Sequence, residues 1–136
     1  MAETLLGFDF GTRRIGIAIG NTLTGSAHAL EIVSTEPLAA RWSAIAAMVA
    51  RWAPQRLVVG RPLHADGTSL PVTRQCERFA RQLTGRFGLP VELVDEGYSS
   101  AEARARIERG PVDAEAAAVI LRQYLSSHRP EPSASR

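Results

Sequence analysis

The chain has 136 residues, of which 45% are hydrophobic and 22% are charged, and its formal net charge is +2. These proportions are typical of one globular domain, and they exclude a fibrous or intrinsically disordered protein. No segment approaches the roughly 20 consecutive apolar residues of a membrane span, and no charged-then-apolar signal segment opens the chain. We therefore expect a cytoplasmic protein without a membrane partner.

Three strand-like runs open the chain. Residues 4–10 form an apolar run that stops at the turn-forming residues 11–14, and residues 15–20 resume it. Two strands joined by a short turn fit this pattern. Residues 28–34 are again rich in strand formers and predict a third strand.

Helical and strand-like patterns alternate after the third strand. Apolar side chains repeat at helical spacing over residues 38–53, after a proline at position 37 that suits a helix start. Residues 56–60 are short and continuously apolar, which is typical of a buried parallel strand. Residues 61–70 predict a polar loop, and residues 71–87 predict a second helix with apolar side chains on one side.

The last part of the sequence predicts one more strand and two more helices. Residues 91–96 form a strand-like run that ends on two adjacent acids. Ser99 or Ser100 can cap a third helix that continues to about Arg109, where Gly-Pro follows. Asp113 can cap a fourth helix, which carries its own apolar stripe.

This order of elements predicts an α/β domain of the ribonuclease H-like class over residues 1–127. We expect a five-stranded mixed sheet, in which an antiparallel meander of three strands is followed by parallel strands, with helices flanking the sheet. A flavodoxin-like sheet would need a helix between the first two strands, and residues 11–14 leave no room for one. Residues 128–136 are rich in Pro and Ser, so we expect a flexible tail there.

Side chains suited to zinc or disulfide chemistry are few. Cys76 is the single cysteine, so the chain can form neither an internal disulfide nor a cysteine-based zinc site. It lies on the apolar side of the predicted second helix and is expected to be inert core. The three histidines, His28, His64 and His128, share no metal-ligand spacing.

All sixteen basic residues are arginine. Residues 41–86 contain eight arginines against two acids, a local charge of +6. Arginine favours forked contacts with phosphate or carboxylate, although a bias in genome composition also explains this usage. On the predicted second helix, Arg74, Arg78 and Arg81 lie opposite the apolar side. They form either a solvated helix face or, together with Arg61, a surface that positions nucleic-acid phosphates.

Acids at the ends of strands are the candidates for chemistry. Asp9 lies between two phenylalanines in an apolar strand, where it either caps the following turn or binds a cation. Asp95 and Glu96 end a strand at the edge where open α/β sheets bind ligands, unless they are solvated loop acids. Asp113 alone is most simply an N-cap.

Three converging carboxylates without His or Cys suit Mg²⁺ or Mn²⁺. Two such ions about 4 Å apart suit phosphodiester hydrolysis.

Four ordered sequence blocks span nearly the whole chain. They are residues 7–18 (GFDFGTRRIGIA), residues 58–63 (VVGRPL) with Asp66-Gly67, residues 94–96 (VDE) and residues 113–117 (DAEAA). In this order and spacing they resemble the YqgF family of small bacterial ribonuclease H-like proteins. Members of that family are described as pre-16S ribosomal RNA nucleases, and earlier as Holliday junction resolvases.

The resemblance implies a metal-dependent nuclease that acts on structured nucleic acid. Its implied role is 5′-end processing of pre-16S rRNA in ribosome biogenesis, with Mg²⁺ or Mn²⁺ as the cofactor in a two-metal site. The implied catalytic and metal-binding acids are Asp9, Glu96 and Asp113. Structured RNA, branched DNA and ribosomal particles are the expected partners, bound by a monomer or a homodimer.

The sequence departs from the family pattern after the paired acids. The family usually has an arginine, an apolar residue and a threonine there, whereas this chain has residues 97–99, Gly-Tyr-Ser. Arg13 and Arg14 could supply the missing positive charge. Alternation along a strand predicts that Asp95 and Glu96 face opposite ways. The family match places the functional acid at Glu96, so Asp95 would hold the following turn or pair with an arginine.

Two other classes of function stay open at this point. Residues 9–12, Asp-Phe-Gly-Thr, also resemble the phosphate loop of the actin and Hsp70 ATPases. Those enzymes enclose the nucleotide between two related domains, and this length provides one. The third possibility is a non-catalytic RNA-binding module for ribosome assembly that retains the acids. Within the nuclease class, resolution of Holliday junctions would favour a dimer that makes symmetric cuts.

Overall fold

A computed structural model describes residues 2–99, 101 and 114–127 of the protein. Five strands form one sheet: β1 (Thr4–Phe10), β2 (Arg14–Asn21), β3 (Ser26–Ser34), β4 (Arg56–His64) and β5 (Val91–Tyr98). Three helices are described: α1 (Leu38–Trp52), α2 (Thr73–Phe87) and α4 (Ala114–Ser127). Of the predicted helix over residues 99–109, the structure describes residues 99 and 101 alone, and the cap at Asp113 and the tail over residues 128–136 lie outside the described residues.

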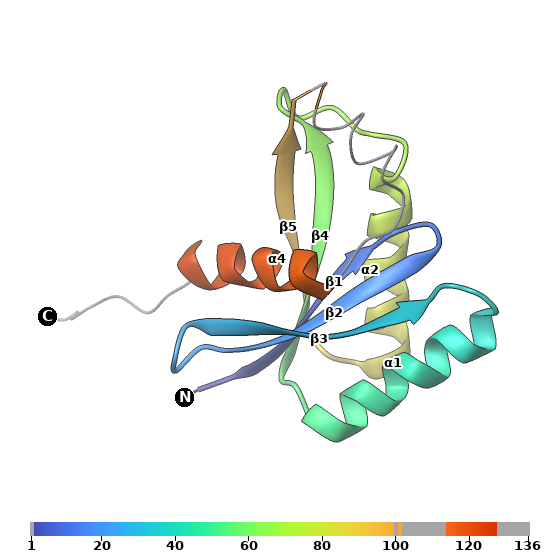
Figure 1. The fold of residues 1–136 in the computed structure, drawn as a ribbon, viewed down its shortest axis with the longest axis vertical. Coiled ribbons are helices and arrows are strands. Elements are labelled where there is room, and N and C mark those ends of the chain that lie inside the picture. Colours follow the sequence, from blue (N-terminus) through green and yellow to red (C-terminus); the bar gives the residue numbers. More distant parts are fainter. Residues whose placement is uncertain (1, 100, 102–113, 128–136) are drawn as a thin grey trace, which may run out of the picture.

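The strand order in the sheet is β3-β2-β1-β4-β5. β2 pairs antiparallel with both β1 and β3, whereas β4 pairs parallel with both β1 and β5. This topology confirms the predicted ribonuclease H-like sheet, an antiparallel meander continued by parallel strands. Figure 1 shows the strong twist between β3 at one edge and β5 at the other.

The prediction of a loop over residues 61–70 was wrong at its start. β4 continues to His64 and β5 to Tyr98, and these two residues are paired in the parallel register. The additional residues of β4 are Arg61, Pro62, Leu63 and His64, which lack the continuous apolar pattern used to predict a buried strand. Hydrogen bonds to the neighbouring strand, rather than local sequence, extend β4.

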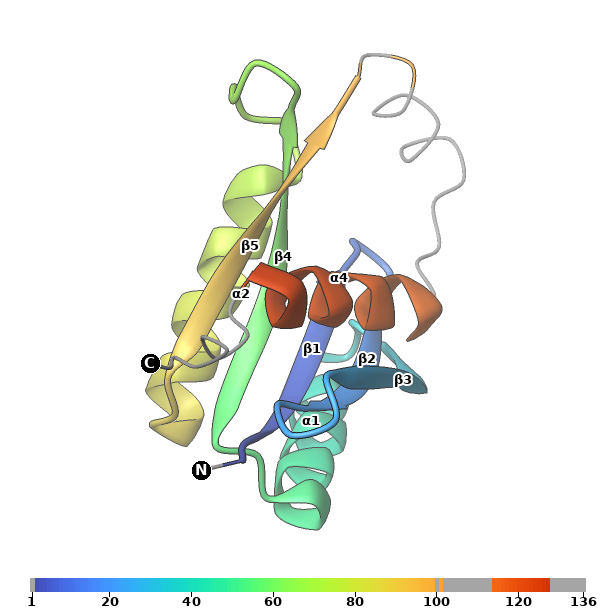
Figure 2. The same ribbon diagram turned by 90° about the vertical axis from the view of Figure 1, so that its left-hand side faces the viewer.

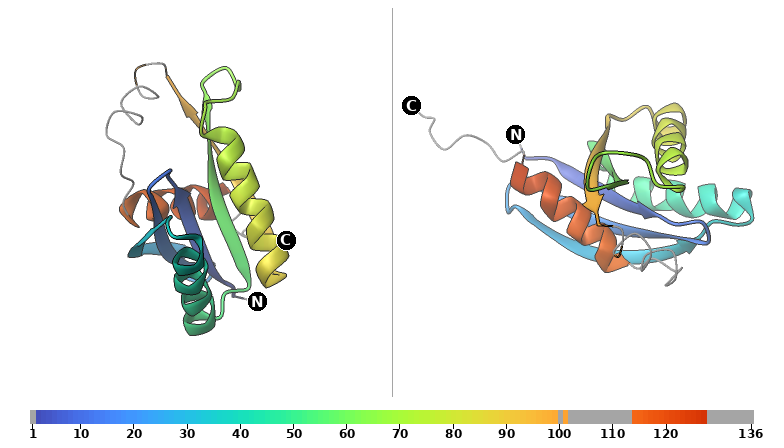
Figure 3. Two further views of the ribbon diagram at one scale, coloured as in Figure 1. Left: turned by 90° about the vertical axis from the view of Figure 1, so that its right-hand side faces the viewer. Right: turned by 90° about the horizontal axis from the view of Figure 1, so that it is seen from above.

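The helices form one layer on each face of the sheet. α1 and α2 cover one face, and α4 crosses the other face at a steep angle to β1 and β2 (Figures 2 and 3). Two separate hydrophobic clusters correspond to these two faces. In the part of the chain that the structure describes, no helix is long and apolar enough to cross a membrane.

The core beneath α1 and α2 is rich in aromatic side chains. Phe79 of α2 packs against Phe10 of β1, with ring centroids 4.9 Å apart, and stacks on Trp42 of α1 at 5.7 Å. Trp42 is 7% exposed and belongs to this core, and the full burial of Cys76 confirms its predicted place in the core. These contacts fix the helix layer against the carboxyl end of β1.

The core beneath α4 depends on a close approach of helix and sheet. Leu121 of α4 lies directly over Gly7 of β1. A Cβ atom at Gly7 would lie 2.4 Å from Leu121 Cγ, a separation that real Cβ atoms do not tolerate. Glycine is therefore needed in the middle of β1 so that α4 can contact the strand backbone.

Candidate active site

Two of the predicted acids lie on one face of the sheet. Asp9 is the penultimate residue of β1 and Glu96 lies near the end of β5, with β4 between these strands. By alternation, Asp9 shares the face of Gly7, which is the face that α4 covers. Glu96 shares it too, because its Oε1 atom and the Ile120 side chain of α4 both approach Gly60.

Asp9 is buried, and Glu96 is half-buried with one carboxylate oxygen withdrawn from solvent. Asp9 is 3% exposed. Its Oδ2 atom, like the Oε1 atom of Glu96, has almost no contact with solvent. A carboxylate in such a place needs nearby donors or positive charge to stay ionised. Two of them at one end of a sheet form a local concentration of oxygen ligands.

Gly60 of β4 separates the two acids in the sheet. A Cβ atom there would lie 2.5 Å from Ile120 Cδ1 and 3.0 Å from Glu96 Oε1. Because Gly60 has no side chain, the Glu96 carboxylate can lie against β4. We did not identify this role from the sequence, although a glycine inside a run of valine and leucine was the available signal.

Asp95 faces the opposite side of the sheet from Glu96, as the alternation of side chains predicts. Arg61 Nε donates a hydrogen bond of 2.7 Å to Asp95 Oδ1, and its Nη1 donates one of 3.0 Å to Glu77 of α2. The hydrogen bond to Asp95 is the main cause that raises the pKa of Arg61. Arg61, a predicted phosphate contact, thus already has two carboxylate partners within the chain.

Arg13 and Arg14 are exposed in the turn between β1 and β2, which is closed by a hydrogen bond from Gly11 N to Arg14 O. Gly16 is opposite Asp9 in the antiparallel register. Arg14 has the same parity as Gly16 in β2, so it lies on the face that carries Asp9. Of the predicted arginines, Arg14 is therefore well placed for a phosphate near the acids.

The α2 arginines lie on the other side of the sheet from the acids. Arg74, Arg78 and Arg81 are all exposed. α2 and α4 lie on opposite faces of the sheet (Figure 3), so these arginines are on the helix layer away from the face of Asp9 and Glu96. The structure therefore places Arg74, Arg78 and Arg81 on the face opposite Asp9 and Glu96, whereas Arg14 lies on the face of the acids.

The third predicted acid, Asp113, lies outside the described residues. Among the residues that are described, there is no group of three or more His, Cys, Asp or Glu side chains arranged to hold a metal ion. Asp9 and Glu96 are still the type of ligand that hard cations such as Mg²⁺ and Mn²⁺ prefer. The donor set thus fits such a cation.

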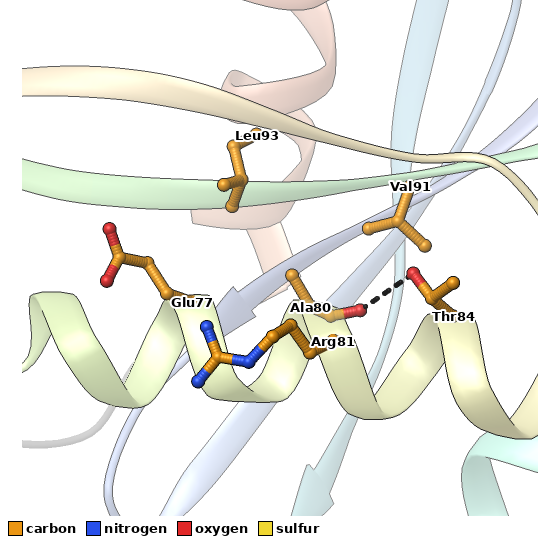
Figure 4. Close-up of a pocket in the computed structure, with 6 residues that line it drawn as sticks. All are labelled: Glu77, Ala80, Arg81, Thr84, Val91 and Leu93. Atoms are coloured by element: carbon orange, nitrogen blue, oxygen red, sulfur yellow. Dashed lines mark hydrogen bonds between the residues drawn. The ribbon is translucent and has the colours of Figure 1, made fainter.

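A hollow of about 400 Å³ lies between α2 and β5, away from the acids. Figure 4 shows Val91 and Leu93 of β5 directed toward the helix, where Glu77, Arg81 and Thr84 complete the wall. Glu77 is bonded to Arg61, and Thr84 Oγ1 donates to Ala80 O at 3.2 Å. This hollow is therefore distinct from the acidic site.

The sheet order and the two helix layers define a ribonuclease H-like protein, with Asp9 and Glu96 at the carboxyl edge of its sheet. The same fold occurs in RuvC of Thermus thermophilus. The comparison with RuvC in complex with a Holliday junction substrate gives a TM-score of 0.56 at 16% identity, and it covers 91% of this chain and 94% of the RuvC chain. A second RuvC structure gives a TM-score of 0.54 at 17% identity, over 91% and 95%.

The chain belongs to the RuvX family, described as Holliday junction resolvase, whose sequence profile matches residues 3–127. It is 55% identical to a Bordetella petrii protein over 126 residues, which are 92% of this chain and 96% of the relative. A Burkholderia multivorans relative is 50% identical over 93% of each chain. Both relatives carry the name "Putative pre-16S rRNA nuclease". The resemblance to YqgF is thereby confirmed, and the enzyme class is nuclease, a hydrolase of ester bonds.

Proposed function

We propose that this protein is a divalent-metal-dependent endonuclease that processes the 5′ end of pre-16S rRNA. The observation that carries the proposal is the placement of Asp9 and Glu96 on one face of the sheet, on either side of Gly60. The names of relatives at 50% and 55% identity support pre-16S rRNA as the substrate.

Asp9, Glu96 and Asp113 would hold the metal ion. A divalent ion, when bound, lowers the pKa of a water molecule and stabilises charge on a leaving oxygen. The buried surroundings of Asp9 strengthen electrostatic attraction between the carboxylates and a cation. Arg14, on the same face, would hold a phosphate of the substrate next to these acids.

Branched DNA is the second candidate substrate. The family is described as Holliday junction resolvase, and one RuvC structure of the same fold contains a Holliday junction. Cutting a junction symmetrically requires two active sites, so this activity would need a homodimer. Trimming the end of an RNA requires one active site, so we propose a monomer for that activity.

The test compares three substrates under the same conditions. Purified protein is incubated with RNA that carries the 16S 5′ leader, with a four-way DNA junction and with ATP, each with Mn²⁺, Mg²⁺ or EDTA. We expect cleavage in the RNA leader that EDTA abolishes. If the junction were cleaved faster than the RNA, the function would be assigned to junction resolution and not to RNA processing. Hydrolysis of ATP alone would instead indicate the nucleotide-binding class.

A further inference from the structure

A second polar hollow lies at the carboxyl end of β1, on the face opposite Asp9. Its volume is about 340 Å³. It is formed by the turn after β1, the start of α1 and one side of α2. The lining residues are Phe10, Thr12, Leu38, Arg41, Gln75, Arg78 and Gln82. None of them is acidic, and five of them have side chains that donate hydrogen bonds.

Arg41 is held in a fixed orientation at this hollow. Its Nε donates a hydrogen bond of 3.0 Å to Thr35 O, and its guanidinium lies 5.5 Å from the centre of the Phe10 ring and 5.8 Å from that of Trp42. Thr35 Oγ1 in turn donates to Thr12 O at 2.8 Å. The arginine and the turn that borders the hollow are therefore linked through one buried threonine.

The positive charge around Arg41 has no close carboxylate. Burial lowers the pKa of Arg41, Glu36 partly offsets this effect, and Arg86 adds to it. In the part of the chain that is described, no carboxylate oxygen lies within 4.0 Å of Arg41, Arg78 or Arg86. Arg56, by contrast, contacts two carboxylates. An anion in the hollow would thus offset the repulsion between Arg41 and Arg86 beyond what Glu36 already offsets.

The donor set selects the kind of anion. Two guanidinium groups can offer paired N–H donors, and the glutamines and the threonine add single donors, a set that matches the several oxygens of a phosphate. Leu38, which is 59% exposed, gives the hollow an apolar border. Such a border suits the sugar of a nucleotide chain better than a fully hydrated ion.

We propose that this hollow, which we term the Arg41 pocket, binds a backbone phosphate of the nucleic-acid substrate. The proposal rests on the proposed nuclease function. Asp9 and Phe10 are consecutive and face opposite sides of β1, so the Arg41 pocket and the acids lie on two sides of one strand end. A structured nucleic acid that covers this end of the sheet contacts both.

The test measures binding without cleavage. Binding of leader RNA and of duplex DNA is measured in EDTA at several salt concentrations for wild type, Arg41→Gln and Arg78→Ala. Arg51→Gln is the matched control, since Arg51 is also on α1 and also lies over a tryptophan, Trp52, at 5.2 Å. We expect a loss of about fivefold for each pocket variant, with a salt slope reduced by about 0.7 to 0.9. The control should stay within about twofold.

Inorganic phosphate and a 5′-mononucleotide serve as separate probes of the source of the phosphate. We expect both to bind only weakly to wild type. Tight binding of a mononucleotide that Arg41→Gln abolishes, with nucleic-acid binding unchanged, would assign the pocket to a free nucleotide and overturn the proposal. Unchanged binding by Arg78→Ala, which removes an exposed side chain and should fold, would also overturn it. Absence of cleavage by wild type would instead contradict the nuclease function, because these binding measurements need no turnover.

Discussion

The two faces of the sheet differ in both packing and charge. The face under α1 and α2 has an aromatic core of Phe8, Phe10, Trp42 and Phe79, and exposed arginines lie on the helix above it. The face under α4 has mostly aliphatic side chains with Tyr124 as the aromatic member, glycines where the helix contacts the strands, and the acids Asp9 and Glu96.

This difference shows how one small domain can separate two tasks. Large rings form a thick, rigid layer that supports α2 and its arginines, which suits a surface for holding phosphates. The glycines let α4 approach the sheet, which withdraws the acids from water on the opposite face. Asp9 and Glu96 are thereby kept apart from Arg74, Arg78 and Arg81, which lie on the other side of the sheet. Four predictions test this division.

The largest effect is expected from Asp9→Asn. The substitution removes one charge and almost no volume, so metal-dependent cleavage should fall by at least about 100-fold, if a metal ligand contributes several kcal/mol to the transition state. Unfolding by urea and binding of RNA in EDTA should match wild type. Cleavage within a few-fold of wild type would exclude Asp9 from the active site.

The neighbouring acids of β5 provide an internal comparison of the two faces. Glu96→Gln should lower cleavage about 100-fold and leave the free energy of unfolding nearly unchanged. Asp95→Asn should keep cleavage within a few-fold and cost up to about 1 kcal/mol of stability, because it removes a half-exposed ion pair with Arg61. Both are assayed over a Mn²⁺ titration and by urea unfolding. An inactive Asp95→Asn with an active Glu96→Gln would assign the chemistry to the opposite face.

The arginines of α2 are expected to act on binding alone. Replacing Arg74, Arg78 and Arg81 together with alanine should weaken RNA and DNA binding about equally, by about 30-fold, and reduce the salt slope by up to about 0.9 per lost contact on duplex DNA. The rate of cleavage at saturating substrate should hardly change. The same salt slope as wild type would place the binding surface elsewhere on the molecule.

The smallest effect is expected from Gly60→Ala. The added methyl group meets Ile120 of α4 and Glu96, so stability should fall by about 1 to 3 kcal/mol and cleavage by about tenfold. Gly85→Ala is the control, because nothing lies within 4 Å of a Cβ atom there and alanine favours the helix. A Gly60→Ala protein that is as active and stable as wild type would show that Glu96 does not depend on this position.

Much of the fold follows from local patterns in the sequence. The apolar run over residues 4–10 predicted β1 with the bounds that the structure gives, and the helical spacing after Pro37 predicted α1 to within one residue. The short turn over residues 11–14 excluded a helix between the first two strands. Local signals were sufficient for these elements because helices and strands each impose their own periodicity on the apolar side chains.

The ends of β4 and β5 could not be predicted in this way. Their last residues are held by pairing between the two strands as far as His64 and Tyr98, and a pairing partner far along the chain leaves no local pattern. The role of Gly60 was missed for a related reason, since the side chain that fills its space, Ile120, comes from a helix about sixty residues later in the sequence.

The sequence alone determined the candidate acids, the excess of arginine and, through alternation, the opposite orientation of Asp95 and Glu96. Only the tertiary structure decided that Asp9 and Glu96 share a face while the α2 arginines lie on the other, and that Arg41 borders a pocket. The physical reason is that periodicity relates residues within one element. Which elements share a face depends on how the chain crosses the sheet and on which surfaces pack together over long distances in sequence.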